Sequence, residues 1–279
     1  MKPWARTTLS LAGVGLAAYT GYGGVLWWYQ DSLIFPVPGG IDRQSLDFGA
    51  HEVGAQTLDL EAADGTALYG WHYRGRGERL VIYLPGNGES VAGNIPLHRL
   101  LQNHNWDVVT LAYRGYPGSE GAPSEEGLVM DATALWEWAS REYPPSSIVL
   151  HGRSLGGGVA THLAEHANPS ALVLESSFRS MRAVAGRWAP IHPVDWLLRH
   201  PFDTETRAPV VGVPTLIVHS STDRLIPPAV SAYEIRDAFA ESESLLVAGW
   251  SHAECLPVVD DQVQRLYLEF LDRAVPLDD

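Results

Sequence analysis

The chain has 279 residues, a net charge of −14, a pI of about 5.1 and 46 % hydrophobic residues, which fits one large domain with a hydrophobic core and a short extra segment. The acidic balance argues against nucleic acid as a partner, because a negative surface repels the phosphate backbone. The single cysteine, Cys255, excludes an internal disulfide and a thiolate metal cluster.

The N-terminal segment differs from the rest of the chain because it lacks charge. The 24 residues 7–30 contain no Asp, Glu, Lys, Arg or His, and Trp27, Trp28 and Tyr29 stand near their end. A helix of this length spans about 36 Å, enough to cross the ~30 Å hydrocarbon layer of a bilayer. We therefore predict a membrane anchor over residues 1–30. A cleaved signal peptide and a buried helix of a soluble protein are the alternatives. The uncharged run is longer than expected for a signal peptide, and its glycines disfavour a helix in a soluble protein.

Basic residues flank this segment unequally. Lys2 and Arg6 precede it closely, whereas the first basic residue after it is Arg43. Because Lys and Arg are enriched on the cytoplasmic side of a span, we expect a single-pass membrane protein whose remaining chain lies on the periplasmic or extracytoplasmic side. Residues 31–55, with prolines and glycines at 36–40, are predicted to form a linker.

The pattern from residue 56 onward indicates a mostly parallel sheet. Residues 56–62 and 67–73 flank the turn signal Asp64-Gly65 and predict an antiparallel hairpin at the sheet edge. The short apolar runs that follow are typical of strands buried on both faces: residues 80–84, 108–112, 148–150, 171–174, 215–218 and 245–248. Helical patterns lie between most of them, at residues 124–141, 155–166, 228–239 and 258–273. The alternation predicts a doubly wound α/β domain over residues 56–279, with a small cap at 177–211.

Residues 152–156 read Gly-Arg-Ser-Leu-Gly and match the G-x-S-x-G pattern between a predicted strand and a predicted helix. This is the context of a nucleophile elbow, in which flanking glycines make room for a sharp turn. The turn would place the hydroxyl of Ser154 above the carboxyl edge of the sheet. The backbone N–H of Leu155, at the start of the helix, would face a developing oxyanion.

A serine nucleophile needs a general base, and in this type of site an acid and then a histidine follow the serine along the chain. Asp223 and His252 each follow a predicted strand and so reach the same sheet edge as Ser154. The loop after the first buried strand contains Asn87, whose backbone N–H we predict as the second oxyanion donor. We find no His/Cys/Asp/Glu cluster with metal-ligand spacing and expect no metal or other cofactor.

Several motifs in combination resemble the membrane-anchored α/β-hydrolases related to α/β-hydrolase domain-containing proteins 13 and 17. The motifs are residues 113–125, 152–157, 223–228 and 251–252. The resemblance runs from about residue 25 to the C-terminus. It implies an α/β-hydrolase fold, a triad of Ser154, Asp223 and His252, and an N-terminal anchor. Some of these relatives cleave acyl thioesters from proteins. One departure is Pro85 at a position where the family usually has a histidine before Gly-Asn.

The sequence thus predicts a serine hydrolase that cleaves carboxylic ester or thioester bonds through an acyl-enzyme on Ser154. Its expected partners are an acyl ester or thioester substrate, either lipid-derived or an acylated protein, and a membrane contacted by the N-terminal helix. Two alternatives remain. One is an amide hydrolase similar to serine aminopeptidases, and the other is a catalytically silent, membrane-tethered binding module on the same fold. The order of serine, acid and histidine favours the hydrolase.

Overall fold

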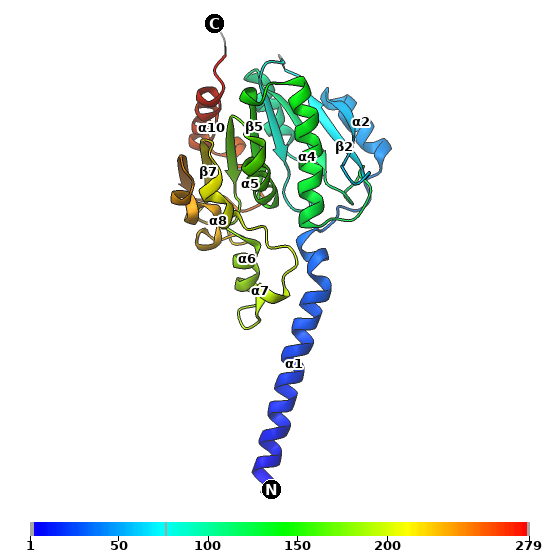
Figure 1. Cartoon of the computed structure of the whole chain (residues 1–279), viewed down its shortest axis with the longest axis vertical. Coiled ribbons are helices and arrows are strands. Elements are labelled where there is room, and N and C mark those ends of the chain that lie inside the picture. The colour runs from blue at the N-terminus through cyan, green and yellow to red at the C-terminus, as the bar shows by residue number, and fades with distance from the viewer. Residues whose placement is uncertain (1–2, 76, 278–279) are drawn as a thin grey trace.

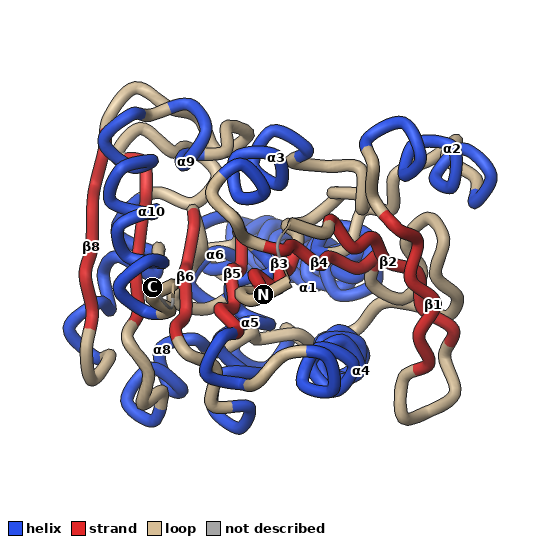
Figure 2. The backbone as a smooth tube through the Cα atoms, turned by 90° about the horizontal axis from the view of Figure 1, so that it is seen from above, coloured by secondary structure: helices blue, strands red, loops and turns tan. Residues whose placement is uncertain are grey.

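The computed structural model describes residues 3–75 and 77–277, with side chains from residue 13 onward. Within this part of the chain, eight strands form one sheet in the order β1-β2-β4-β3-β5-β6-β7-β8 (Figure 2). The β1–β2 and β2–β4 pairs are antiparallel, and all other neighbours are parallel. The predicted fold class, a mostly parallel α/β-hydrolase sheet with a hairpin at its edge, is confirmed.

The strands follow the predicted apolar runs closely. Their bounds are β1 (Gln56–Glu61), β2 (Ala67–Tyr73), β3 (Leu80–Leu84), β4 (Asp107–Ala112), β5 (Ile148–Arg153), β6 (Ala171–Glu175), β7 (Thr215–Ser220) and β8 (Ser242–Val247). Every residue of β3 to β7 is buried, whereas the edge strands β1 and β8 are partly exposed. Central strands covered on both faces explain why these runs lack the alternation of polar and apolar residues.

Helices cover both faces of the sheet. They are α3 (Ile95–Asn103), α4 (Glu125–Glu142), α5 (Leu155–Ala167), α8 (Thr204–Arg207), α9 (Leu256–Val259) and α10 (Asp261–Ala274). Helices α4, α5 and α8 pack together on one face, and α3 and α9 lie on the other (Figure 2). The predicted cap for α4 is present, since the Ser124 side chain accepts a hydrogen bond from the Gly127 N–H.

Two predicted helices differ from the structure. The region 228–239 forms two 3₁₀ segments, Pro228–Val230 and Ala232–Ala238, because two consecutive prolines open it and Ile235 leaves the helical conformation. The region 258–273 is broken at Asp260, whose side chain accepts from the N–H groups of Gln262 and Val263 and starts α10 there.

The predicted linker 31–55 contains a helix, α2 (Arg43–Val53). Asp42 caps it by accepting from the Ser45 N–H, and Gly54 ends it with a φ of 72°. Its buried residues, Leu46 and Ala50, pack on the hydrophobic core, so the segment is part of the domain. Within the predicted linker, the non-helical residues are 35–42, where the prolines lie, and residues 54–55 after α2.

Helix α1 (Pro3–Ile34) leaves the domain as a long rod (Figure 1). In the part of the chain that the structure describes, no helix meets the length and hydropathy required for crossing a membrane, so the predicted span is not supported. Lys2, which contributed to the predicted orientation, lies outside the described residues.

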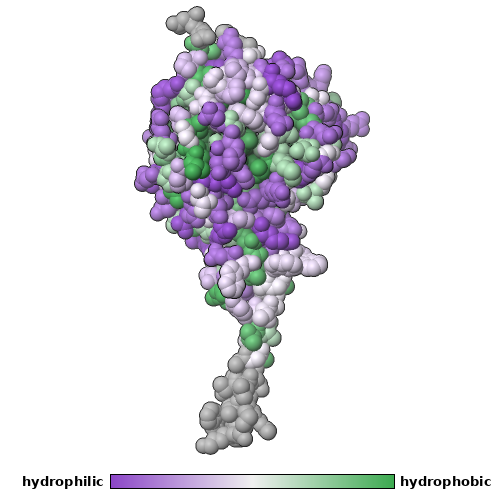
Figure 3. Space-filling model, viewed as in Figure 1, coloured by the Kyte–Doolittle hydropathy of each residue, from purple (hydrophilic) through white to green (hydrophobic). Residues whose placement is uncertain are grey.

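The region predicted as a cap contains α6 (Met181–Trp188) and α7 (Val194–Leu197), which lie beside the C-terminal half of α1 (Figure 1). Gln30 joins them, since its amide donates to the Leu197 carbonyl at 3.0 Å and accepts from the Arg199 N–H at 2.7 Å. Asp31 also pairs with Arg199 at 2.9 Å and with His200 at 3.1 Å. Residues of lower polarity gather where α1 meets this region (Figure 3). The cap and α1 therefore form one packed unit.

Candidate active site

Ser154 lies in the turn between β5 and α5 with φ 50° and ψ −114°, in the positive-φ region where a residue with a Cβ is strained. Two glycines permit this turn. A Cβ at Gly152 would collide with the carbonyl oxygen of Gly156, and a Cβ at Gly156 with that of Leu84. The G-x-S-x-G segment thus forms a sharp turn that presents the serine side chain at the carboxyl edge of the sheet.

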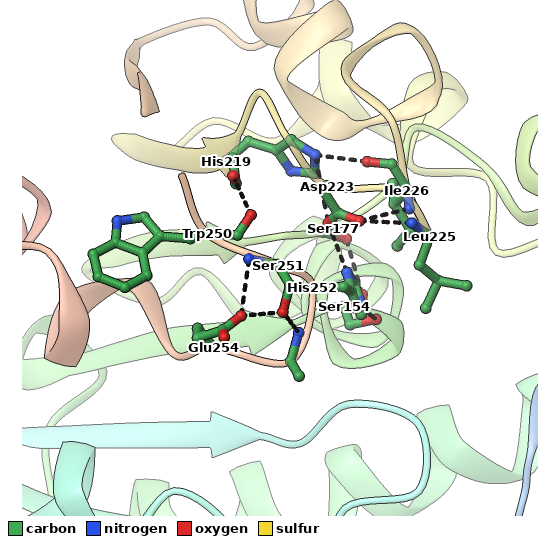
Figure 4. Close-up of polar contacts among 12 residues, drawn as sticks. Ser154, Ser177, His219, Asp223, Leu225, Ile226, Trp250, Ser251, His252 and Glu254 are labelled. Carbon is green, nitrogen blue, oxygen red and sulfur yellow. Dashed lines mark hydrogen bonds and ion pairs between the residues drawn. The ribbon is translucent and has the colours of Figure 1, made fainter. Parts of the chain in front are cut away.

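The structure brings the three residues predicted as a triad together (Figure 4). Ser154 Oγ lies 2.9 Å from His252 Nε2, and His252 Nδ1 lies 2.7 Å from Asp223 Oδ2. Because a carboxylate only accepts, Nδ1 carries the proton of the neutral ring and Nε2 is free to accept from the serine hydroxyl. The three side chains form a continuous hydrogen-bonded series from nucleophile to carboxylate.

Asp223 is completely buried, whereas the His252 side chain is 17 % exposed. Burial acts to raise the pKa of Asp223, but the hydrogen bond and charge of His252 outweigh it and the pKa lies below its ordinary value. Its other oxygen, Oδ1, accepts from the N–H groups of Leu225 and Ile226, both at 2.9 Å. The carboxylate is therefore held charged and fixed in orientation beneath the imidazole.

Both predicted oxyanion donors line the same cavity as Ser154. Leu155 is the first residue of α5, where backbone N–H groups have no partner within the helix. Asn87 is in the loop after β3, and a Cβ on its neighbour Gly86 would lie 3.3 Å from Ser154 Cβ. The Asn87 side chain donates to the Ile34 carbonyl at 2.9 Å, so its Nδ2 is engaged by the end of α1.

Comparison with known proteins agrees with this geometry. Residues 79–199 match the family model described as alpha/beta hydrolase fold. An uncharacterized protein of Mycobacterium tuberculosis is 32 % identical over 233 residues, which cover 81 % of this chain and 82 % of the relative. The chain belongs to the α/β-hydrolase family. The finer resemblance to domain-containing proteins 13 and 17 stays a prediction.

Two further comparisons concern a lipase and an esterase. The lysophosphatidylserine lipase ABHD12 of Danio rerio is 30 % identical over 190 residues, covering 60 % of this chain and 48 % of that protein. This chain therefore aligns with about half the length of that lipase. The Pyrococcus furiosus esterase Pf2001 has a TM-score of 0.70 at 18 % identity, covering 85 % of this chain and 98 % of the esterase. The latter likeness is one of fold.

The loop that carries His252 is held from two sides, by residues that the sequence analysis did not identify. Ser220 and Thr222 donate to the Trp250 carbonyl at 2.6 and 2.9 Å. Arg153 Nη2 donates to the His252 carbonyl at 2.8 Å. Arg153 is the variable residue before the nucleophile, so the same turn that positions the serine also fixes the loop of the base.

Arg153 belongs to a buried charge network behind the triad. Its guanidinium pairs with Glu89, and its Nε lies 3.7 Å from Glu175 Oε1. Glu175 also lies 3.1 Å from His151 Nε2 and accepts from the Leu256 N–H at 2.7 Å. Burial acts to raise the pKa of Glu175, but the hydrogen bond from His151 and the charge of Arg153 lower it below its ordinary value. The sequence signal for this network was Glu175, a charged residue at the end of the apolar run that forms β6.

A cavity of about 890 Å³ opens beside the triad. Its walls are the α1 residues between Tyr22 and Ile34, the loop containing Gly86 and Asn87, and helices α6 and α7. Ser154 and His252 line it as well. The candidate active site therefore continues into a space between the N-terminal helix and the cap.

One prediction about metals needs correction. His162, Glu165 and His166 on α5 place their ligand atoms within 4.8 Å of one another, so one His/Glu cluster with suitable spacing does exist. The i, i+3, i+4 pattern explains it, because these positions share one helix face. Glu165 is paired with Arg207, and burial together with the charge of Arg207 lowers the pKa of His162 to about 4. None of the three lines the cavity at Ser154.

Proposed function

We propose that this α/β-hydrolase is a serine-dependent acyl hydrolase that cleaves carboxylic ester or thioester bonds. The proposal rests on one observation, the hydrogen-bonded series from Ser154 through His252 to Asp223 with spacings of 2.9 and 2.7 Å. A serine hydroxyl alone is a weak nucleophile, and such a series is the arrangement that activates it.

In the first half-reaction, His252 Nε2 accepts the hydroxyl proton while Ser154 Oγ attacks the acyl carbon. Asp223 stabilises the imidazolium that forms and keeps the ring oriented. The backbone N–H groups of Leu155 and Asn87 donate to the oxyanion of the tetrahedral intermediate. When the intermediate collapses, the imidazolium gives its proton to the departing alcohol or thiol, and the acyl group remains esterified to Oγ.

In the second half-reaction, water enters the position left by the alcohol or thiol. His252 takes a proton from the water, and the resulting hydroxide attacks the acyl carbon. The same oxyanion donors act again. The proton returns to Ser154 Oγ as the acid product is released, so the enzyme is regenerated and one water is consumed in each cycle.

The comparisons support this proposal at the level of reaction class. One relative is named a lysophosphatidylserine lipase, and a protein of like fold is named an esterase, so both names denote ester hydrolysis. Among substrates, we place lipid-derived esters and acylated proteins ahead of peptides, because the cavity next to Ser154 is lined mainly by aliphatic and aromatic side chains. Amide hydrolysis is the runner-up.

A fluorophosphonate probe and a short ester test the proposal. Wild-type protein should be labelled and should hydrolyse p-nitrophenyl butyrate, whereas Ser154→Ala should be unlabelled and slower by several orders of magnitude. The variant Ser177→Ala is a suitable control, since this buried hydroxyl donates to the Ser154 carbonyl at 3.0 Å and is not the nucleophile. Labelling that persists in Ser154→Ala would reject the assignment. Absence of both activities in folded wild-type protein would favour a silent binding module.

The cellular position of the domain is a separate proposal that rests on sequence. We propose that it faces the extracytoplasmic side, supported by Arg6 before the uncharged segment and the distance to Arg43 after it. Exposed apolar side chains on α1, among them Val14 and Trp28, would favour contact with lipid. Extraction with carbonate tests attachment, and protease treatment of intact spheroplasts tests the side.

A further inference from the structure

The cavity beside Ser154 has its charged groups at one end only. Glu89 and Arg153, the two residues of its lining that carry full charge, belong to the catalytic end. Further away the walls are mainly apolar, with Leu26 from α1, Val184 and Ala185 from α6, and Leu197 from α7. A charged group placed against these apolar side chains would lose hydration, whereas an apolar group would be favoured.

The length of the cavity follows from its α1 wall. Asn87 donates to the Ile34 carbonyl at 2.9 Å, so the last turn of α1 lies against the loop next to Ser154. The lining continues along the helix to Tyr22, twelve residues earlier. At a rise of about 1.5 Å per residue, the cavity extends roughly 18 Å from the catalytic loop. A space this long and continuous with the nucleophile fits an extended chain attached to the scissile carbonyl.

At the far end of the cavity, α1 contacts the cap directly. The ring of Tyr19 stacks on that of His192 with centroids 4.4 Å apart, and Tyr19 also donates to the Ile191 carbonyl at 2.9 Å. Gly23 allows this approach, because a Cβ there would lie only 2.9 Å from the His192 ring. Gln30 binds α7 at a point closer to Ser154, so two sets of contacts hold α1 against the cap along this cavity.

We propose that α1 and α6–α7 form an acyl-binding channel, so that the preferred substrate carries a long acyl chain on the carbonyl attacked by Ser154. This inference rests on the proposed hydrolase function and adds the substrate class. Helix α1 is then a wall of the substrate site. Each additional methylene that moves from water into such a channel buries more apolar surface, which would favour long chains over short ones.

The test compares chain lengths in variants with a blocked channel, using the full chain in one detergent. Ala185→Trp fills the channel from α6, and Leu26→Trp fills it from α1. Ala240→Trp makes the same change at an exposed position outside the cavity and is the matched control. The ratio of kcat/KM for p-nitrophenyl palmitate to that for the butyrate should fall at least tenfold in both channel variants and stay unchanged in the control.

The outcomes separate this inference from the proposed function. If butyrate hydrolysis and probe labelling of Ser154 are present but the palmitate-to-butyrate ratio is the same in all variants, the channel assignment is wrong and the hydrolase assignment stands. If only Ala185→Trp changes the ratio, α1 is not a wall of the site. If no ester is cleaved, the channel assignment is tested by the binding of the fluorescent fatty acid cis-parinarate to the Ser154→Ala protein. Loss of binding on adding Ala185→Trp supports the channel, and undiminished binding refutes it.

Discussion

The strained backbone at Ser154 gives a prediction about stability with a definite sign. At φ 50° and ψ −114°, a residue with a Cβ is destabilised by about 1–3 kcal/mol, and glycine is not. Both Ser154→Ala and Ser154→Gly remove the hydroxyl and its contact with His252, so their difference isolates the Cβ. Glycine gains more freedom in the unfolded chain, which offsets about 0.5–1 kcal/mol of the relief. We expect Ser154→Gly to be more stable than Ser154→Ala by about 1 kcal/mol.

Urea unfolding and thermal melting of the two variants measure this difference. For a protein of this size, 1 kcal/mol corresponds to a rise in Tm of roughly 2–4 °C. Ser140, inside α4, supplies the matched control because its backbone is helical. There the glycine variant should be less stable than the alanine variant by about 1 kcal/mol. If Ser154→Gly is less stable than Ser154→Ala, as at Ser140, the turn is not strained and the reasoning fails.

Three further predictions concern the groups around the serine. Arg153→Met removes the donor to the His252 carbonyl and leaves Glu175 without its cationic neighbour. Because breaking a buried ion pair of this kind costs about 3–5 kcal/mol, Tm and kcat for butyrate should both fall. An unchanged kcat would contradict the positioning role of Arg153. Because the pKa of Asp223 is lowered in the folded protein, its ionisation stabilises the fold above about pH 4 and this contribution is lost as pH falls through the lowered pKa. Wild-type protein should thus lose its Tm advantage over Asp223→Asn in acid, and an advantage that is equal at pH 3 and pH 6 would refute the shift. Treatment with EDTA should leave ester hydrolysis intact, because the serine–histidine pair needs no Lewis acid; loss on chelation and recovery with a divalent ion would reject this.

The sheet was predictable because its strands are specified locally. The runs at β3, β5 and β6 are short, apolar and separated by helical patterns, and few folds satisfy that alternation. The juxtaposition of Ser154, Asp223 and His252 was predictable for a related reason. Once parallel strands are assumed, the residues that follow them meet at one edge of the sheet, whatever their separation along the chain.

Other features depend on contacts that a pattern of residues does not contain. The segment 43–53 has few apolar residues, and its helix is stabilised by the Asp42 cap and by packing of Leu46 on the core. The role of Arg153 requires knowing that the His252 carbonyl lies within 2.8 Å of its guanidinium. The uncharged stretch before residue 30 suggested a lipid neighbour, whereas part of it faces the cap. Hydropathy shows that a segment favours an apolar neighbour over water, but it does not show whether that neighbour is lipid or protein.

The contacts of α1 also bear on the geometry of the catalytic loop. The loop after β3 is fixed from inside by Glu89, which accepts from the Gly86 N–H at 2.8 Å. From outside it is fixed by α1, through the hydrogen bond from the Asn87 side chain to Ile34. The backbone N–H proposed as oxyanion donor therefore belongs to a residue whose side chain is held by the N-terminal helix. The same helix contributes the wall of the channel along which the acyl chain would lie. A boundary at residue 30 would divide the proposed channel, because Tyr22 and Leu26 of its wall lie before that residue and the cap residues of its wall lie after it.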